Sequence, residues 1–482
     1  MFHVSQHIDE DKIFIVKKSE IDGRLDPKMA LYNKRAHHYL YPTEKLKDLL
    51  LSKPQYGASE AAYTRTYDKQ PRYIRITDID EYGLISLDEL GATVKNVEEK
   101  YILTEDDIVI ARSGATVGKS YIHKRLPYSC VYAGYLIRFI VDPKKILPDY
   151  FFTYTQLKPY KEWIKAIQRP SAQPNINVEE YESLEIPLPD LGKQKEFVEY
   201  IKDAYLQKYQ KDTEAQKLLD SIDGYILNEL GLELPDYQSD LNSRIFQVRH
   251  KELTDRIDPY YSQRYFKDSF QAIDSGKYPV VMLSNLAKLI TSGITPKSGG
   301  DAYTDDKNNG IPFIRSGNIN IDGDLDYNEL IYLKPEVHNT VMKSSQVHMN
   351  DIMIAIVGAT IGQVGIYLSD SDANINQAIA LVRLKDGVNV QYVKELIKSK
   401  IGQLSLNRLK RPVPRANINL EEIATIRIVI PPLCKQQEMA NRIKSIRQQA
   451  KALQEEGKTI LENAKREIEK MIIDESSVDY YV

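Results

Sequence analysis

Several residue types are scarce in this sequence, and their scarcity excludes whole classes of protein. Cysteine occurs at only two of 482 positions, Cys130 and Cys434. They stand far apart and in no metal-ligand spacing, which argues against a disulfide scaffold or a zinc site. No apolar run is long enough to span a bilayer, and the polar first residues, MFHVSQHIDEDK, lack a signal-peptide core. We therefore expect a cytoplasmic protein that does not enter a membrane.

An excess of either charge is also lacking. The 65 Lys and Arg residues nearly balance the 68 Asp and Glu residues, which gives a formal net charge of −3. This balance argues against a histone-like protein that holds DNA by overall positive charge, but it allows a local basic groove. The length favours two or three globular domains.

Signatures of catalysis are equally scarce. We find no Asn/Asp-Pro-Pro-Tyr/Phe methyltransferase motif, no Gly-x-Gly-x-x-Gly loop, no complete Walker loop, no carboxylate–lysine nuclease cluster and no His/Cys ligand group. The stretch ARSGATVGKS at residues 111–120 comes close to a nucleotide-binding loop, which is Gly, four residues and Gly-Lys-Ser/Thr. Its first glycine, Gly114, stands one position late.

What the sequence does contain is a long internal repeat. Phe14–Pro27 matches Phe246–Pro259, Asp106–Gly118 matches Asn350–Gly362, and shorter matches keep the same order. The offset between the copies changes by only a few residues at a time, as loop insertions would cause. A repeat of this length indicates a duplicated domain and not a solenoid unit.

The repeat also bears on the loop at residues 111–120. The second copy keeps Gly-Ala-Thr-x-Gly but has neither the Lys nor the Ser that a nucleotide loop needs. We therefore interpret the shared glycines as bends at strand ends: Gly114, Gly118, Gly358 and Gly362.

Each copy is expected to be a mixed α/β domain. Runs of β-branched residues bounded by Gly, Asn or Asp predict strands at 107–111, 135–141, 351–357 and 378–384. Helices are predicted after each Asp-Pro pair and at 147–161 and 390–406. The opening segments 14–16 and 246–248 are expected to be extended.

A long helical pattern follows each copy. Apolar residues at three-and-four spacing predict helices at 193–230 and 435–473. Each apolar stripe needs a partner to bury it, so we expect an antiparallel pair or coiled coil with a globular domain at each end.

This layout resembles the specificity subunits of bacterial type I restriction-modification systems, and the resemblance covers nearly the whole chain. The motifs that carry it are Ser292–Pro296 (SGITP), Ile311–Ile319 (IPFIRSGNI), the two Gly-Ala-Thr-x-Gly loops, Gln173–Asn177 (QPNIN), and Lys-Gln-x-Glu at 193–196 and 435–438. The first copy departs from the pattern, because Lys53–Ala58 (KPQYGA) stands where the second has SGITPK.

The resemblance implies a mixed α/β (α+β) fold of two duplicated target-recognition domains separated by two long antiparallel helices. The recognition domains would be residues 1–192 and 233–434, and the helices 193–232 and 435–482. It implies a subunit without catalysis of its own that reads a bipartite target in double-stranded DNA. Two methyltransferase subunits would dock on the helices and methylate adenine N6, and restriction subunits would join them. S-adenosylmethionine, ATP and magnesium would belong to those partners, and no cofactor to this chain.

Candidate DNA contacts are forked donors, amides and hydroxyls in loops where the copies diverge. In the first copy they are Arg65, Lys69, Arg72, Arg112, Ser113, Lys119, Arg169 and Gln173. In the second copy they are Thr295, Lys297, Lys307, Asn308, Arg411 and Arg415. Gln173 stands opposite Arg415, and Arg112 and Val357 differ beside the glycine loops, as different half-sites would require. Arg75 and Arg315, alike in both copies, are either ion-pair partners or phosphate contacts.

Other functions stay open from the sequence alone. The same architecture could serve a type II-like restriction–methylation enzyme or another phage-defence complex. A stand-alone ATPase that uses residues 111–120 and a scaffold that does not bind DNA are further alternatives. The sequence names neither the target bases nor the gap between half-sites.

Overall fold

The computed structural model places most of the chain. The residues it describes are 14–16, 26–35, 37–87, 90–168, 174–238, 245–249, 256, 258–297, 299–328, 330–411, 413 and 416–474. Contacts divide the chain into two compact units: unit 1 is Met1–Asp212 with Gln454–Val482, and unit 2 is Thr213–Leu453. Each unit includes part of both long helices, so these divisions differ from the domain boundaries expected at residues 192 and 434.

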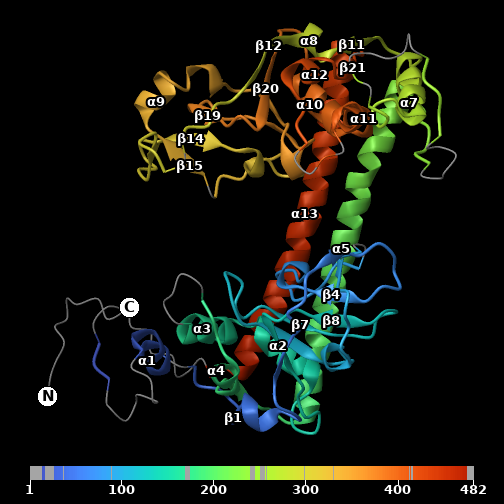
Figure 1. The fold of residues 1–482 in the computed structure, drawn as a ribbon. Coiled ribbons are helices and arrows are strands. Elements are labelled where there is room, and N and C mark those ends of the chain that lie inside the picture. Colours follow the sequence, from blue (N-terminus) through green and yellow to red (C-terminus); the bar gives the residue numbers. More distant parts are fainter. Residues whose placement is uncertain are drawn as a thin grey trace. The chain divides into compact units, whose positions relative to one another are not determined.

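The sheets of unit 1 form two main layers (Figure 1). The first is antiparallel, in the order β2 (Gln55–Tyr56), β9 (Leu136–Phe139), β6 (Ile108–Ala111) and β7 (Ser120–Ile122). The second has the order β3 (Tyr63–Thr64), β5 (Ala92–Thr93), β4 (Arg72–Ile74) and β8 (Cys130–Tyr132), and its last pair is parallel. A short antiparallel pair joins β1 (Thr43–Lys45) to β10 (Glu185–Pro187).

The sheets of unit 2 repeat this topology strand for strand. The antiparallel sheet has the order β12 (Ala287–Ser292), β20 (Ile379–Leu384), β17 (Ile352–Ala355) and β18 (Val364–Ile366). The mixed sheet has the order β13 (Tyr303–Thr304), β15 (Ile331–Leu333), β14 (Ile311–Ile314), β19 (Ala373–Ile375) and β16 (Gln346–Val347), with β14 and β19 parallel. The short pair is β11 (Val280–Met282) with β21 (Arg427–Val429). The duplication is therefore confirmed, and β16 corresponds to a single antiparallel bridge between Ile102 and Val131 in unit 1.

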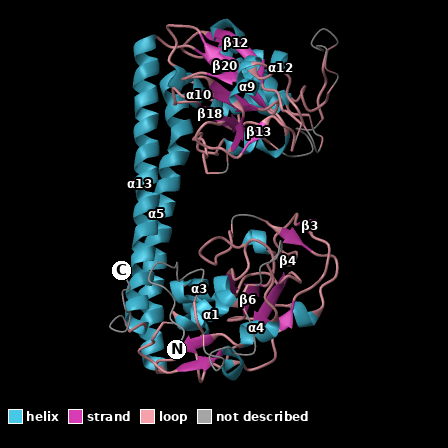
Figure 2. Ribbon diagram, turned by 90° about the vertical axis from the view of Figure 1, so that its left-hand side faces the viewer, coloured by secondary structure: helices cyan, strands magenta, loops and turns pink. Residues whose placement is uncertain are grey.

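Helices cover the sheets of each unit (Figure 2). In unit 1 the short ones are α1 (Pro27–Lys34), η2 (Leu46–Leu49), η3 (Ile76–Asp78), η4 (Glu99–Tyr101), α2 (Pro148–Gln156), α3 (Lys158–Ile167) and α4 (Val178–Glu182). In unit 2 they are α7 (Arg264–Asp274), α8 (Leu283–Leu286), η6 (Ser316–Asn318), α9 (Pro335–Asn339), η7 (Lys343–Ser345), η8 (Gly358–Thr360), α10 (Val390–Lys398), α11 (Lys400–Leu409) and α12 (Leu420–Ala424).

The central strand β6 shows why its sequence is apolar throughout. Successive side chains of a strand point to opposite faces. Ile108 and Ile110 accordingly join the core against the helices, whereas Val109 and Ala111 join the core against the second sheet. Strand β17 does the same, with Ile352 and Met353 in different cores. Both strands are buried on both faces, so alternation of apolar and polar residues is absent.

The two long helices are α5 (Leu191–Leu230) and α13 (Leu433–Ile472), each of 40 residues. Within unit 1, Phe197 and Ile201 share a core with Leu461 and Ile468. Within unit 2, Ile222 and Ile226 share a core with Met439 and Ile443. Ion pairs cross between the helices in both units, Lys211–Glu456 at 2.9 Å and Lys435–Glu229 at 2.5 Å. The helices therefore bury each other's apolar stripes and run in opposite directions.

Some local expectations need correction. Residues 14–16 and 246–248 form no strand, and the helix expected after Pro259 starts at Arg264, after a turn. The helix expected at 147–161 is interrupted at Leu157, where Pro159 cannot donate a helical hydrogen bond. The helix expected at 390–406 is interrupted at Ser399, whose hydroxyl donates to the Leu396 carbonyl at 2.7 Å and competes with the helical pattern.

Candidate nucleic-acid interface

The Gly-Ala-Thr-x-Gly loops follow β6 in unit 1 and β17 in unit 2. All four glycines have positive φ: +89° at Gly114, +86° at Gly118, +74° at Gly358 and +96° at Gly362. Residues with a Cβ rarely adopt this conformation. The loops therefore bend sharply as they leave the central strand of each first sheet.

Each loop is fastened to the Asn-Ile-Asn segment of the same unit. In unit 1 the Gly114 N–H donates to the Pro174 carbonyl at 3.1 Å, and the Ile176 N–H donates to the Arg112 carbonyl at 2.8 Å. In unit 2 the Gly358 N–H donates to Ala416 at 3.1 Å, and the Ile418 N–H to Ile356 at 3.0 Å. Arg112 thus corresponds to Ile356, and Ser113 to Val357, which corrects the pairing of Arg112 with Val357.

The second asparagine of each segment is structural. The Asn177 side chain accepts from the Glu180 N–H at 2.7 Å at the start of α4, and Asn419 accepts from Glu422 at the same distance at the start of α12. Both are N-cap residues in capping boxes. The Asn-Ile-Asn part of the family motif therefore holds the glycine loop and starts a helix.

The side chains of Lys119 and Ser120 both form hydrogen bonds within unit 1. The Lys119 ammonium donates to the Ile79 carbonyl. The buried Ser120 hydroxyl lies 2.7 Å from Thr155 Oγ1 and accepts from Gln156 Nε2 at 2.7 Å. In a nucleotide-binding loop the lysine reaches the phosphates and the hydroxyl binds magnesium. The arrangement does not support the ATPase interpretation of residues 111–120.

Arg65 and Arg72 need correction as DNA contacts, because each is only 1% exposed. Arg65 donates to the carbonyls of Gln70 at 2.9 Å and Leu90 at 3.2 Å, and its guanidinium lies 3.9 Å from the centre of the Tyr128 ring. Arg72 donates to the Tyr128 hydroxyl at 3.4 Å. Both arginines brace the interior of unit 1 and are not available to a ligand at the surface.

Other candidates lie at the surface. The exposed ones are Lys69, Thr295, Lys297, Lys307, Asn308 and Arg411. Arg411 is also tied to its own unit, because it donates to the Asn417 carbonyl at 2.7 Å and to Glu422 at 3.0 Å. Arg169, Gln173 and Arg415 lie outside the described residues. The DNA contacts of these surface side chains stay predictions.

Arg75 is an ion-pair partner, one of the two roles considered for it. Its guanidinium donates to both carboxylate oxygens of Asp78, at 2.7 and 3.0 Å, and the pair raises the pKa of Arg75. Its backbone N–H also donates to Asp78 at 2.8 Å. The Arg315 N–H makes the same contact with Asn318, at 2.9 Å. These residues shape the turn after the parallel strand in each unit.

A shallow pocket of about 410 Å³ opens beside the glycine loop of unit 1. We name it the Arg112 pocket, and its lining residues are Ala58, Ser59, Glu60, Tyr73, Arg112, Ser113, Gly134 and Tyr135. The Arg112 guanidinium lies 4.7 Å from the centre of the Tyr56 ring. Sequence comparison identified Arg112 and Ser113, but it missed Glu60, Tyr56 and Tyr135.

A signal in the sequence could have located Tyr56. A Cβ added to Gly57 would stand 2.4 Å from the Ala133 carbonyl oxygen, and a Cβ on Gly293 would stand 2.0 Å from that of Ile375. Only glycine fits either position. Gly57 and Gly293 are therefore equivalent, and Tyr56 of KPQYGA takes the place of Ser292 of SGITPK.

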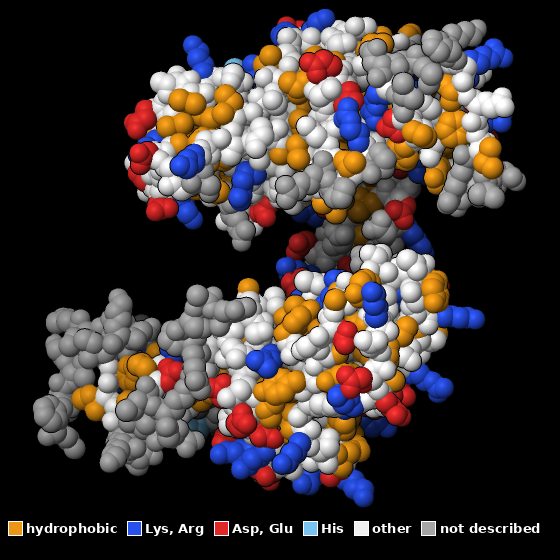
Figure 3. Space-filling view, viewed as in Figure 1, with side chains coloured by type: hydrophobic (Ala, Val, Ile, Leu, Met, Phe, Trp, Pro, Cys, Tyr) orange, Lys and Arg blue, Asp and Glu red, His pale blue; other side chains and the backbone are white. Residues whose placement is uncertain are grey.

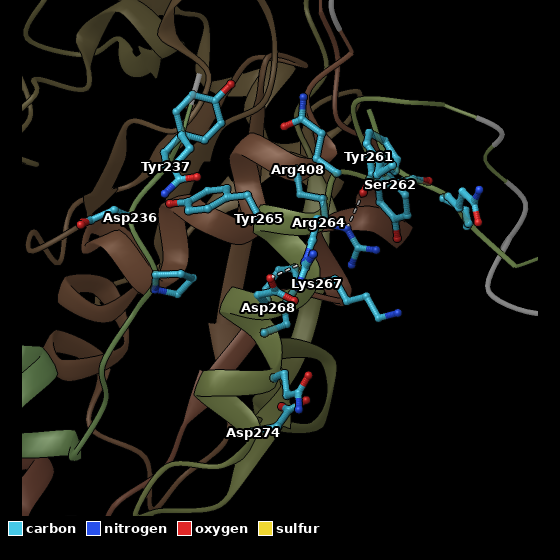
Figure 4. Close-up of a pocket in the computed structure, with 18 of the residues that line it drawn as sticks. Asp236, Tyr237, Tyr261, Ser262, Arg264, Tyr265, Lys267, Asp268, Asp274 and Arg408 are labelled. Atoms are coloured by element: carbon cyan, nitrogen blue, oxygen red, sulfur yellow. Dashed lines mark hydrogen bonds and ion pairs between the residues drawn. The ribbon is translucent and has the colours of Figure 1, made fainter. Parts of the chain in front are cut away.

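A second cavity, of about 1490 Å³, lies in unit 2 between α7 and the residues that follow α5 (Figure 4). Arg408 lies against the rings of Tyr261 and Phe270, at 3.9 and 5.2 Å from their centres, and burial lowers its pKa. Arg427 lies 4.7 Å from the Phe270 ring and pairs with Asp274. Arginines that stack on aromatic rings or pair with a carboxylate stabilise packing. We therefore assign Arg408 and Arg427 a structural role in this cavity.

On the face drawn in Figure 3, Lys and Arg side chains lie among Asp and Glu side chains in both units. Within the described ranges there is no group of three or more His, Cys, Asp or Glu side chains that could hold a metal ion. Among the same residues, no helix is both long and apolar enough to cross a membrane.

Comparison with known proteins identifies the family. A sequence model described as the type I restriction modification DNA specificity domain matches residues 59–219 and 276–463, more than half of the chain. The specificity subunit of the type I restriction enzyme EcoBI from Escherichia coli is 32% identical over 143 residues, or 30% of this chain and 30% of that protein. The chain thus spans less than a third of that relative's length in the match.

Two further relatives match over greater length. The specificity subunit of the type I restriction enzyme MjaVIII from Methanocaldococcus jannaschii is 22% identical over 390 residues, or 79% of this chain and 81% of that protein. A crystal structure of the type I restriction-modification S subunit from M. genitalium covers 91% of this chain and 97% of its own, at 11% identity and a TM-score of 0.40. With its two matched regions, one in each copy of the repeat, this chain belongs to the type I restriction-modification specificity subunit family.

Proposed function

We propose that this chain reads a bipartite target in double-stranded DNA, one half with each copy of the duplicated domain. The observation that carries this proposal is the contrast between the two glycine loops. Their backbones follow the same path and make the same hydrogen bonds. At the two positions before the first glycine, however, unit 1 has Arg112 and Ser113 whereas unit 2 has Ile356 and Val357. A common frame with different side chains is suited to two different half-targets.

The chain itself carries out no catalysis in this proposal. It brings a target to two methyltransferase subunits, which supply S-adenosylmethionine chemistry, and to restriction subunits, which supply ATP and magnesium chemistry. The complex would act in the cytoplasm, where the DNA is.

The long helices offer a surface to the methyltransferase subunits. On α5, four large hydrophobic side chains stay exposed: Leu191, Tyr200, Leu206 and Tyr209. Exposed aromatic and aliphatic side chains on a helix are typical of a surface that a partner covers. We propose further that the length of α5 and α13 sets the gap between the half-targets, so that a longer pair would give a longer gap.

The test is to co-express the chain with its cognate methyltransferase subunit and to sequence the host genome by a long-read method that detects N6-methyladenine. We expect methylation at one split motif. Exchange of residues 28–186 for the corresponding segment of another specificity subunit is expected to change one half of the motif and leave the other half as it was. A continuous motif, or no methylation with an active partner, would contradict the proposal.

A further inference from the structure

The walls of the Arg112 pocket are held by hydrogen bonds to backbone carbonyls. The Gly57 N–H donates to the Leu136 carbonyl at 3.1 Å, and the Gly134 N–H donates to the Ala58 carbonyl at 2.8 Å. The buried Tyr73 hydroxyl donates to the same Ala58 carbonyl at 2.7 Å. These bonds place the segment that carries Glu60 beside the segment that carries Arg112. The pocket is therefore formed before any ligand arrives.

Arg112 is oriented and yet has unused hydrogen-bonding capacity. Its N–H donates to the Tyr135 carbonyl at 2.9 Å and its carbonyl accepts from Ile176 at 2.8 Å, which fixes the backbone on both sides. Its guanidinium lies over the Tyr56 ring. In the part of the chain that the structure describes, Arg112 has no carboxylate partner, whereas Arg75 and Arg138 pair with Asp78 and Asp107. The forked donors of Arg112 therefore remain available to a ligand.

Glu60 supplies acceptors to the same pocket. Its side chain is half-buried, and no ion pair within 4.0 Å involves its carboxylate among the described residues. Arg112 and Glu60 thus face one pocket without neutralising each other. The major-groove edge of a G·C pair presents the complement of this set, since guanine offers O6 and N7 as acceptors and cytosine offers N4 as a donor.

We infer that the Arg112 pocket reads one G·C base pair in the half-target of the first domain, with Arg112 donating to guanine and Glu60 accepting from cytosine. The inference rests on the proposed function, because it presumes that unit 1 binds DNA. The second domain lacks this reader. At the equivalent position Ile356 is 4% exposed and has no polar group to offer.

The experiment uses the full chain in complex with its cognate methyltransferase subunit. Methylation rates are measured on duplexes that carry each of the four base pairs at each position of the motif. In the Arg112→Gln complex we expect the preference for G·C at one position of the first half to fall about tenfold to a hundredfold, because a bidentate pair supplies that discrimination. All other positions should keep their preferences. Glu60→Gln should weaken the preference at the same position.

Two controls keep the result interpretable. Arg125→Gln removes an exposed arginine that has no pairing in the described residues and does not line the pocket, and it should leave every position unchanged. Arg112→Lys keeps the charge and loses the fork, so it should lower the preference even if Arg112→Gln does not fold. Thermal melting of each complex verifies folding.

The outcomes separate the two proposals. If the wild-type complex yields a split motif but both Arg112 variants keep the wild-type preferences, the pocket is not a base reader. The inference is also overturned if Arg112→Gln slows methylation equally on all duplexes and weakens the salt dependence of binding, because that is the behaviour of a phosphate contact. A wild-type complex that reads no split motif would instead overturn the proposed function.

Discussion

Gly457 of α13 lies so close to Lys208 of α5 that a side chain at position 457 would be crowded. A Cβ on Gly457 would stand 3.3 Å from Lys208 Cα and 3.2 Å from Lys211 Cβ. Glycine within a helix costs about 1 kcal/mol relative to alanine, and here the close approach of the two helices explains its presence. The helix pair in unit 1 is therefore packed through backbone as well as through side chains.

Substitution of Gly457 is expected to destabilise unit 1. Gly457→Leu should lower the free energy of unfolding by about 1–3 kcal/mol, as overpacking of a tight contact does. Gly224 of α5 provides the matched control, since a Cβ there would meet nothing within 4 Å. Gly224→Leu should raise stability by about 0.5–1 kcal/mol through helix propensity. Chemical denaturation followed by circular dichroism measures both, and equal effects would contradict the close approach.

The two glycines of the first loop should differ in their tolerance of alanine. A Cβ on Gly118 would stand 2.8 Å from Ile164, whereas a Cβ on Gly114 would meet nothing within 4 Å. Both positions have positive φ, which alone costs about 1 kcal/mol or more. Gly118→Ala should therefore lower the free energy of unfolding by about 2–4 kcal/mol, and Gly114→Ala by about half as much. Similar losses at the two sites would show that Ile164 yields at no cost.

The asparagines that begin α4 and α12 should affect stability and not target choice. Asn177→Ala and Asn419→Ala each remove an N-cap and should cost about 0.5–2 kcal/mol. The methylated motif should stay the same. Asn308, an exposed candidate reader, serves as the contrasting position: Asn308→Ala should leave stability unchanged. A new motif in either N-cap variant would assign that asparagine a direct role in reading.

Lys398 makes the stability of unit 2 depend on pH. Its ammonium nitrogen is buried without a hydrogen-bond partner among the described residues, and burial, together with Arg447 and Lys394, lowers its pKa to about 8, against opposing effects of Glu395 and Asp322. Between this pKa and the ordinary value of 10.5, the unfolded chain binds the proton and the folded chain does not. The free energy of unfolding should therefore rise as the pH increases from about 8 to 10.5, by up to about 3 kcal/mol.

The control for this pH effect comes from the first domain. Helix α2 ends at Gln156 where α10 ends at Lys398, so Lys398→Gln introduces the neutral side chain of the other copy. The difference in unfolding free energy between wild type and Lys398→Gln should shrink as the pH rises. Chemical denaturation at pH 7.0, 8.5 and 10.0 measures it, and a constant difference would contradict a lowered pKa.

Much of the fold could be predicted from the sequence because the chain repeats itself. The ordered matches between the copies predicted two equivalent domains, and β-branched runs predicted the central strands β6 and β17 within two residues. The break at Leu157 could have been predicted, because Pro159 inside a helical pattern is a sequence signal for a helix end. The break at Ser399 could not, because no proline marks it and the apolar pattern continues through both helices. Apolar residues at helical spacing show which face of a helix is buried, but they do not show whether one helix continues or two helices follow each other.

The candidate site could be predicted only in part, for a related reason. Arg112 could be proposed as a candidate contact from the sequence, because the two copies differ at this position within an otherwise shared loop. Arg65 looked equally suitable, but its donors meet carbonyls of Gln70 and Leu90 that no sequence spacing reveals. Glu60 was missed because hydrogen bonds between distant strands, such as Gly134 to Ala58, bring it to the pocket. The burial of Arg65 and the position of Glu60 beside Arg112 both result from tertiary contacts, which the sequence does not reveal.

The way the glycine loops are fastened has a consequence for how new targets can arise. Every bond that holds each loop to its Asn-Ile-Asn segment is made by backbone atoms. The side chains of Arg112 and Ser113 are therefore not needed to maintain the path of the first loop, whereas Ile356 belongs to the core of unit 2. A substitution of Arg112 or Ser113 can alter the groups that the first loop exposes while its backbone stays in place. Under the proposed function, single amino-acid changes at these two positions would give the protein a new half-target without rebuilding its fold.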